Sequence, residues 1–294
     1  MFYGAIAYAD DVSLLCPSRH AVKYMLQIAK GFSDEYNVTF NHNKSNILVF
    51  ENENDKNDNF KNIVFDKSTI THIERGKHLG NIIGKDSVIK NIETGIGDFY
   101  ARVNMLLSNF PNVFPWIKYK LFKSFCMPLY GVQLWDLSSN RIQSFYVAWR
   151  KCIRRLLNLP YRTHCKLLNM VCNDLPVDMQ IHKRFIKFFH SVITNPNKCI
   201  EMCGKLVMNG SQSITCHNLN YICALYSLRK DILPKSNVSR IIHSMANVYV
   251  SSQCFNSISK ASLVSELMYM REYPHLTDFN LDEIKFMLED VCTS

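Results

Sequence analysis

The chain has 294 residues, 47% of them hydrophobic, and its 34 lysines and arginines outnumber its 25 acids to give a formal net charge of +9. This composition excludes an intrinsically disordered chain, and the length is sufficient for a large core and for two domains. The 11 scattered cysteines argue against a disulfide framework, and no apolar run reaches the roughly eighteen residues of a membrane span, so we expect an intracellular, soluble chain.

The first 85 residues predict short strands, turns and one helix. Apolar and β-branched runs bounded by turn residues predict strands over residues 2–8, 12–15, 46–50, 63–65, 70–73 and 78–83. A helix capped by Ser18 is predicted over residues 19–36. Its apolar positions at helical spacing are Val22, Met25, Leu26, Ala29 and Phe32. The polar segment 51–62 predicts a solvent loop.

From residue 86 the hydrophobic period changes from two to about 3.6, which indicates helices. One helix is predicted over residues 86–107, although Gly95 and Gly97 weaken it. A second begins near residue 117 and must end or kink at Pro128. The clearest helix covers residues 141–159. Its apolar stripe consists of Ile142, Phe145, Trp149, Cys152, Ile153 and Leu156.

These patterns predict an α+β fold, in which a small antiparallel β region is followed by a mostly α-helical body. Three segments differ in composition and period, and we take them as the predicted domains. They are residues 1–85, residues 86–190 and residues 191–294. The last segment alternates helical patterns with polar loops and predicts no role.

The net positive charge is confined to the middle segment. Residues 86–190 carry 15 basic and 6 acidic side chains, whereas basic and acidic residues balance, 10 against 10 and 9 against 9, in the segments before and after it. Four of the basic residues lie on the polar side of the helix predicted over 141–159: Arg150, Lys151, Arg154 and Arg155. Like charges at this spacing repel, so a polyanion such as nucleic acid or the solvent must offset them.

Two adjacent acids, Asp10 and Asp11, interrupt the apolar stretch AIAYADDVSLL of residues 5–15. An unpaired carboxylate in a half-buried strand is costly to desolvate. We expect both acids to lie at the tip of a tight hairpin, projecting past the sheet toward solvent or a divalent ion, while the flanking residues stay in the core. Mg²⁺ prefers a few carboxylates together with substrate phosphates, although paired acids can also merely decorate a turn.

The acids belong to an ordered set of motifs. G-x-x-x-YADD-x-x-LL at residues 4–15 is followed by the predicted helix, by FNHNKSNILVF at 40–50 and by KHLGNIIG at 77–84. This order resembles the latter half of the palm of a reverse transcriptase, in particular that of non-LTR, LINE-type retrotransposons. The run KLFKSFCMPLYGVQLW at 120–135 resembles the thumb region that follows the palm. The resemblance implies a palm remnant, then a helical thumb.

The resemblance also implies roles for single residues. Asp10 would bind catalytic Mg²⁺ or Mn²⁺ with Asp11 beside it, and Tyr8 would lie near the primer terminus or the incoming nucleotide. Lys44 would lie near the triphosphate, where it can neutralise or protonate the leaving pyrophosphate; the alternative is an ordinary turn lysine. The primer grip is implied for His78, Leu79 and Gly80. The partners implied are an RNA template, a DNA primer and deoxynucleoside triphosphates, with no membrane, and a nuclear location is expected.

The chain departs from the family in what precedes the YADD motif. The family places the other main metal-binding aspartate on an earlier strand, and seven residues stand before Tyr8. We therefore expect a truncated fragment that is inactive alone as an RNA-directed DNA polymerase. The alternative is a non-catalytic nucleic-acid-binding module that uses the basic helical segment. A stand-alone two-metal nuclease is the weakest reading, because no second acid cluster pairs with Asp10.

Overall fold

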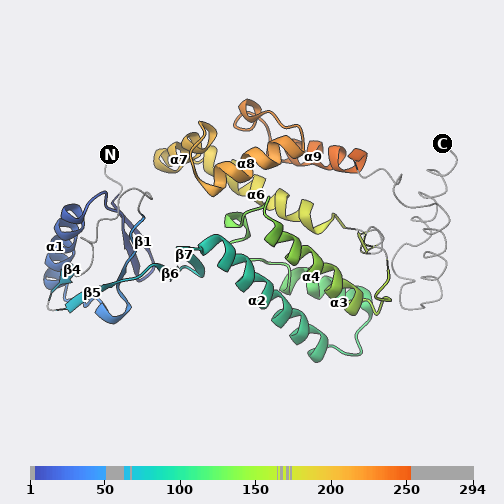
Figure 1. Cartoon of the computed structure of the whole chain (residues 1–294), viewed down its shortest axis with the longest axis horizontal. Coiled ribbons are helices and arrows are strands. Elements are labelled where there is room, and N and C mark those ends of the chain that lie inside the picture. The colour runs from blue at the N-terminus through green and yellow to red at the C-terminus, as the bar shows by residue number, and fades with distance from the viewer. Residues whose placement is uncertain are drawn as a thin grey trace. The chain divides into compact units, whose positions relative to one another are not determined.

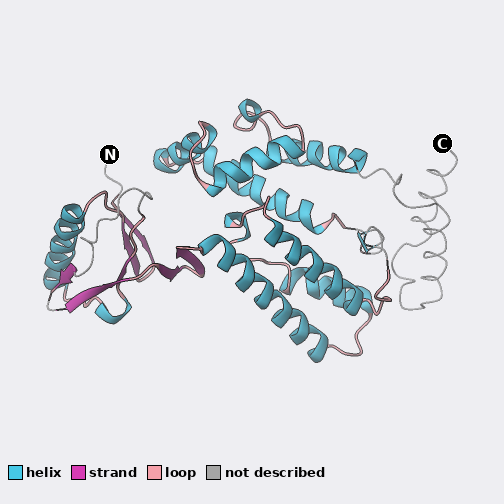
Figure 2. Cartoon of the chain, in the orientation of Figure 1, coloured by secondary structure: helices cyan, strands magenta, loops and turns pink. Residues whose placement is uncertain are grey.

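A computed structural model describes residues 4–50, 63–66, 68–163, 165, 168–169, 172 and 174–252. The fold class is α+β, as predicted. The chain divides into two compact units, Met1–Ser87 and Val88–Ser294, and the described strands belong to the first while helices build the second (Figures 1 and 2). The predicted loop over 51–62 lies outside the described residues.

The first unit contains three small sheets. The strands are β1 (Ala5–Tyr8), β2 (Asp11–Leu14), β3 (Asn46–Ile47), β4 (Ile63–Phe65), β5 (Ser68–His72), β6 (Arg75–His78) and β7 (Asn81–Gly84). Strands β1 and β2 form one antiparallel hairpin, and β6 and β7 form another. In the third sheet β5 is central, pairing antiparallel with β4 and parallel with β3. Part of the predicted antiparallel region is therefore mixed.

The β6–β7 hairpin replaces the single strand predicted over residues 78–83. Leu79 and Gly80 form its two-residue turn, and both have positive φ angles, 45° and 80°. Two successive residues in this conformation match the right-handed twist of the strands that they join. The alternation around residue 78 was visible in the sequence, but the unusual conformation of a leucine concealed the turn.

Helix α1 (Arg19–Tyr36) has the predicted bounds. The side chain of Ser18 accepts a hydrogen bond from the Ala21 N–H, and Asn37 ends the helix in the left-handed conformation. Met25 is buried, whereas Phe32, one of the apolar positions at helical spacing, is 50% exposed. Phe32 instead belongs to a second, exposed apolar stripe, which consists of Tyr24, Ile28, Phe32 and Tyr36.

The second unit is helical. Its elements are α2 (Ser87–Asn109, starting at the unit boundary), α3 (Pro115–Phe125), the 3-10 turn η3 (Val132–Leu134), α4 (Asn140–Leu156), α6 (Val177–Ile193), α7 (Lys198–Met208), α8 (Ile214–Leu225), the 3-10 turn η4 (Lys230–Ile232) and α9 (Val238–Ser252). Helix α3 ends three residues before Pro128, as a proline at that position requires. The boundary predicted after residue 190 falls inside α6.

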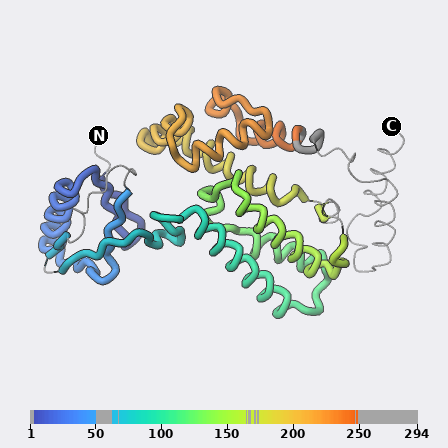
Figure 3. The backbone as a smooth tube through the Cα atoms, viewed as in Figure 1, coloured from blue at the N-terminus to red at the C-terminus, as the bar shows by residue number. Residues whose placement is uncertain are grey.

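One hydrophobic core joins the helices of the second unit. Helix α6 contacts α4 on one side and α7 and α9 on the other, as the backbone trace makes visible (Figure 3). The stripe predicted for α4 is confirmed, because all six of its members are buried. The core extends from Ile92 in α2 to Met245 in α9, which is why α6 and α7 do not begin a separate domain.

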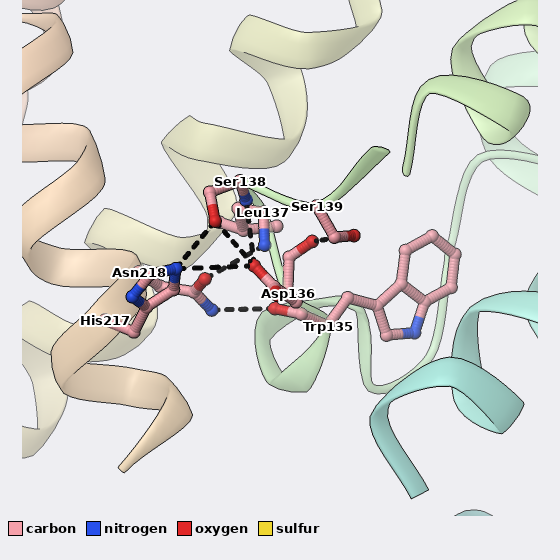
Figure 4. A network of polar contacts seen from close by, with 7 residues as sticks. All are labelled: Trp135, Asp136, Leu137, Ser138, Ser139, His217 and Asn218. Carbon is pink, nitrogen blue, oxygen red and sulfur yellow. Dashed lines mark hydrogen bonds and ion pairs between the residues drawn. The ribbon is translucent and has the colours of Figure 1, made fainter. Parts of the chain in front are cut away.

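A buried side-chain amide connects α8 with the segment between η3 and α4. Asn218 donates a hydrogen bond to the Trp135 carbonyl at 2.7 Å and accepts one from the Leu137 N–H at 2.9 Å. Next to it, His217 Nε2 lies 2.6 Å from Ser138 Oγ, which donates to the Asp136 carboxylate (Figure 4). Asn218 is fully buried, whereas the side chain of His217 is more than half exposed. The amide thus satisfies two backbone groups that water does not reach.

A buried histidine makes the stability of the second unit dependent on pH. Burial of His182 in α6, where its Nδ1 lies 2.9 Å from the Tyr226 hydroxyl, lowers its pKa from 6.5 to about 4. Between these values the unfolded chain binds a proton that the folded chain does not. The contribution of His182 to the free energy of unfolding is therefore expected to fall by about 3 kcal/mol as the pH drops from 6.5 to 4.

The variant His182→Gln removes this titration. Urea unfolding at several pH values across the window should show a shallower loss of stability for the variant than for the parent chain. Equal slopes for the two proteins would show that His182 is not the group responsible.

Candidate functional site

The YADD motif forms the tip of the β1–β2 hairpin, as predicted. Tyr8 and Asp11 are the closing pair, and Ala9, with a φ of 52°, and Asp10 form the turn. Asp10 and Asp11 are exposed, and neither carboxylate forms a hydrogen bond or ion pair within the described part of the chain. Both carboxylates therefore have their oxygen atoms available to a cation.

The flanking apolar residues are not in the core, contrary to the prediction. Ile6, Tyr8 and Val12 are 56%, 66% and 52% exposed. The exposed carboxylates therefore carry little desolvation cost, and the described residues of the first unit leave the apolar side chains of the hairpin uncovered. A two-stranded ribbon of this kind is only marginally stable by itself and offers unpaired edges to a further strand.

One contact brings two of the four sequence motifs together. Ser13 Oγ, in β2, lies 3.3 Å from His78 Nε2, at the end of β6. Because side chains two residues apart share a face of a strand, Ser13 projects from β2 on the same face as Asp11. The predicted primer-grip turn, His78 with Leu79 and Gly80, therefore lies next to the YADD hairpin although 65 residues separate the contacting side chains. Ser13 was not among the predicted site residues, although strand alternation places it on the same face as Asp11.

Lys44 lies in the 3-10 turn η1 (His42–Lys44), where the Asn41 side chain accepts a hydrogen bond from its backbone N–H. The turn contacts β5, which fixes its backbone. Lys44 is exposed, and no ion pair joins it to Asp10 or Asp11 in the described structure. The structure therefore places Lys44 in an ordered turn of the same unit without bringing its ammonium to the carboxylates.

A cavity of about 250 Å³ opens next to η1, between the end of α1 and the β4–β5 turn. Lys30 lines it and is paired with Asp34 at 2.6 Å and with Asp66 at 3.5 Å. The hydrogen bond that Lys30 donates to the Asp34 carboxylate raises the pKa of Lys30, and Asp66 adds to the effect. Because the Lys30 ammonium is already paired with two carboxylates, it is not available to a triphosphate, and Lys44 stays the candidate for that role.

The predicted basic patch on α4 is partly occupied by internal contacts. The guanidinium of Arg154 donates to the Thr163 carbonyl at 2.6 and 3.1 Å, and Arg155 donates to Asn104 of α2 at 3.2 Å. Arg150 is half-buried and interacts with Asp178 at the start of α6. Lys151 is exposed and has no such partner among the described residues. Asp178 offsets part of the charge of Arg150, whereas the partners of Arg154 and Arg155 are neutral groups that hold the two guanidinium groups in place without reducing their charge.

The donor set at the hairpin tip fits magnesium in part. Two exposed carboxylates that have no partner among the described residues are the kind of ligands that Mg²⁺ uses. Within the described residues, no three His, Cys, Asp or Glu side chains gather where they could hold a metal ion.

Neither a membrane-spanning helix, within the described residues, nor a similar known protein is found for this chain. Over the residues that the structure describes, no helix has the length and apolar character to cross a membrane. Comparison with models of protein families, with curated proteins and with solved structures finds no match for this chain.

Proposed function

We propose that this chain supplies the later part of a reverse-transcriptase palm and acts in RNA-directed DNA polymerisation of a non-LTR retrotransposon. The observation that carries the proposal is the Ser13–His78 contact, which joins the YADD hairpin to the HLG turn. Both motifs belong to the set that resembles a reverse-transcriptase palm, and a polymerase needs the metal ligands and the primer grip at one place.

The proposal assigns each residue a part in nucleotidyl transfer. The primer 3′-oxygen bonds to the α-phosphorus of the incoming triphosphate, the bond to pyrophosphate breaks, and the hydroxyl proton passes to solvent. Bound Mg²⁺ would supply the positive charge that such a reaction requires. Asp10 and Asp11 would hold it, and Lys44 would neutralise the leaving pyrophosphate. Tyr8, 66% exposed at the end of β1, offers a ring against the primer terminus or the nucleotide.

The proposal includes a further aspartate on an additional strand. The family resemblance implies such a strand ahead of the YADD hairpin, and the uncovered hairpin has an edge and apolar side chains suited to receive it. Without the aspartate the charge that stabilises the transition state is incomplete, so the 294 residues alone are expected to be inactive.

The second candidate is a non-catalytic nucleic-acid-binding module, and the charge distribution favours it specifically. Residues 99–173 contain 11 lysines and arginines but a single acid, Asp136. A long-range positive field of this kind attracts phosphate whether or not the palm is complete.

The two candidates are separated by an assay of RNA-templated primer extension. The test protein is the product of the complete reading frame of the transcript that encodes this chain, supplied with a DNA primer, deoxynucleoside triphosphates and Mg²⁺. The variant Asp10→Asn removes a metal ligand while preserving side-chain size. Asp34→Asn is the matched control, because Asp34 is an exposed acid of α1 in the same unit.

A further inference from the structure

The segment around α3 combines basic and aromatic residues and has no acid. Residues 99–135 contain no acid, four basic residues and ten aromatic residues. No side chain caps the N-terminus of α3, and its first turn carries no acid, so the helix dipole adds to the positive potential. Basic side chains combined with exposed aromatic rings are the two components of surfaces that bind single-stranded nucleic acid.

Helix α3 divides these side chains between two faces. Its inner face is buried in the core and consists of Pro115, Lys118, Tyr119 and Phe122. The outer face carries the half-buried Trp116 and, one and two turns further on, the exposed Lys120 and Ser124. Phe114, directly before the helix, is 66% exposed. A large aromatic ring and an ammonium group are therefore presented to solvent from the same short segment.

Among the three lysines of α3, Lys120 keeps an uncompensated charge. Lys118 is buried and donates to the Pro111 carbonyl, and Lys123 is paired with Asp174 at 2.7 Å. The ammonium of Lys120 instead lies 4.2 Å from the centroid of the Trp116 ring, and no acid pairs with it in the described structure. A cation–π contact fixes the position of an ammonium without neutralising it, which prepares it to receive an anion.

We propose that the outer face of α3 binds a single-stranded nucleic acid, with Lys120 on a phosphate and a base stacked on Phe114. The exposed ring favours a single strand over a duplex, because the bases of a duplex are already stacked on one another. The choice of nucleic acid as partner rests on the proposed function. The binding itself requires neither Mg²⁺ nor Asp10, so the two proposals can fail separately.

The protein contains a natural reporter for this contact. Of its three tryptophans, Trp135 and Trp149 are each 2% exposed in the core, whereas Trp116 lies at the surface beneath Lys120. A phosphate that draws the Lys120 ammonium away from the ring changes the surroundings of Trp116 alone. Tryptophan fluorescence should therefore change when the strand binds.

The experiment is a titration of the purified chain, without Mg²⁺, with oligo(dT) and separately with oligo(U), followed by tryptophan fluorescence at several salt concentrations. Phe114→Ala is expected to weaken binding about tenfold. Lys120→Ala is expected to reduce the slope of log affinity against log salt by about 0.7. Lys90→Ala is the control, because that lysine is paired with Glu93 on α2. Urea unfolding checks that each variant folds.

Binding by the parent chain that is lost in the Phe114 and Lys120 variants but kept in the Lys90 variant would support the proposal, and the two oligonucleotides show whether DNA or RNA is preferred. Equal affinity and equal salt slope for all variants, or no fluorescence change on saturation, would overturn it. Weakening by Lys151→Ala instead would locate the interface on α4. Polymerase activity without α3 binding would overturn this inference alone.

Discussion

Replacing Asn218 with alanine is expected to lower the free energy of unfolding of the second unit by about 3 kcal/mol. The substitution removes the partners of the Trp135 carbonyl and of the Leu137 N–H, and both groups stay buried (Figure 4). Each buried backbone group left without a hydrogen bond costs about 1–3 kcal/mol. Urea unfolding followed by circular dichroism measures the change.

Two further variants test whether the two hydrogen bonds of the Asn218 amide cause the loss of stability. Asn218→Asp keeps the acceptor for Leu137 but turns a carboxylate oxygen toward the Trp135 carbonyl, so it should destabilise at least as much as alanine. His217→Ala removes exposed contacts to Ser138 and Asp136 one residue away, and should change stability by less than about 1 kcal/mol. A stable Asn218→Ala protein would mean that the amide does not hold this segment.

Replacing Gly95 with alanine is expected to destabilise the second unit by about 2 kcal/mol. A Cβ at this position would lie 2.8 Å from Trp135 Cη2 and closer still to Cζ2, and Trp135 is fully buried. The ring cannot move without disturbing its edge-on contact with Phe145. The free-energy cost of overpacking therefore exceeds the gain in helix propensity from glycine to alanine, which is about 1 kcal/mol.

Gly97 provides the matched control for Gly95. It lies two residues away in the same helix, and a Cβ there would meet nothing within 4 Å. Gly97→Ala should stabilise the protein by up to about 1 kcal/mol, the opposite sign. Combining Gly95→Ala with Trp135→Leu should cost less than the sum of the two single changes, because the smaller side chain frees the space. Equal effects of the two glycine substitutions would contradict the packing described for Trp135.

Local sequence patterns were sufficient to predict individual helices, because a helix makes its backbone hydrogen bonds within its own segment. The bounds of α1 and the buried stripe of α4 follow from capping and from the 3.6-residue period, both of which act within one helix. The role of Gly95 could not be predicted in this way. Glycine has a low helix propensity, which argues against a glycine inside this helix. A glycine fits here because the ring of Trp135, 40 positions further along the chain, occupies the space that a Cβ would need.

The sequence was sufficient to predict which residues form the candidate site but not what surrounds them. The turn at Asp10 follows from local sequence, whereas the exposure of Ile6 and Val12 depends on which neighbours the strands find. The internal partners of Arg154 and Arg155, a carbonyl and an asparagine, are set by how α4 packs. These neutral partners hold the guanidinium groups in place without reducing their charge, so a count of charges along the sequence does not show which side chains are held by the protein, and it did not single out Lys120.

The measurement that tests the central claim most directly is RNA-templated primer extension by the protein of the complete reading frame, with Asp10→Asn beside it. We predict Mg²⁺-dependent extension, reduced at least about a hundredfold by Asp10→Asn and unchanged by Asp34→Asn, with none by the 294 residues alone. Extension that survives Asp10→Asn, or no extension by the complete protein, would contradict the polymerase role of the YADD hairpin. Extension by the 294 residues alone would contradict the incomplete site.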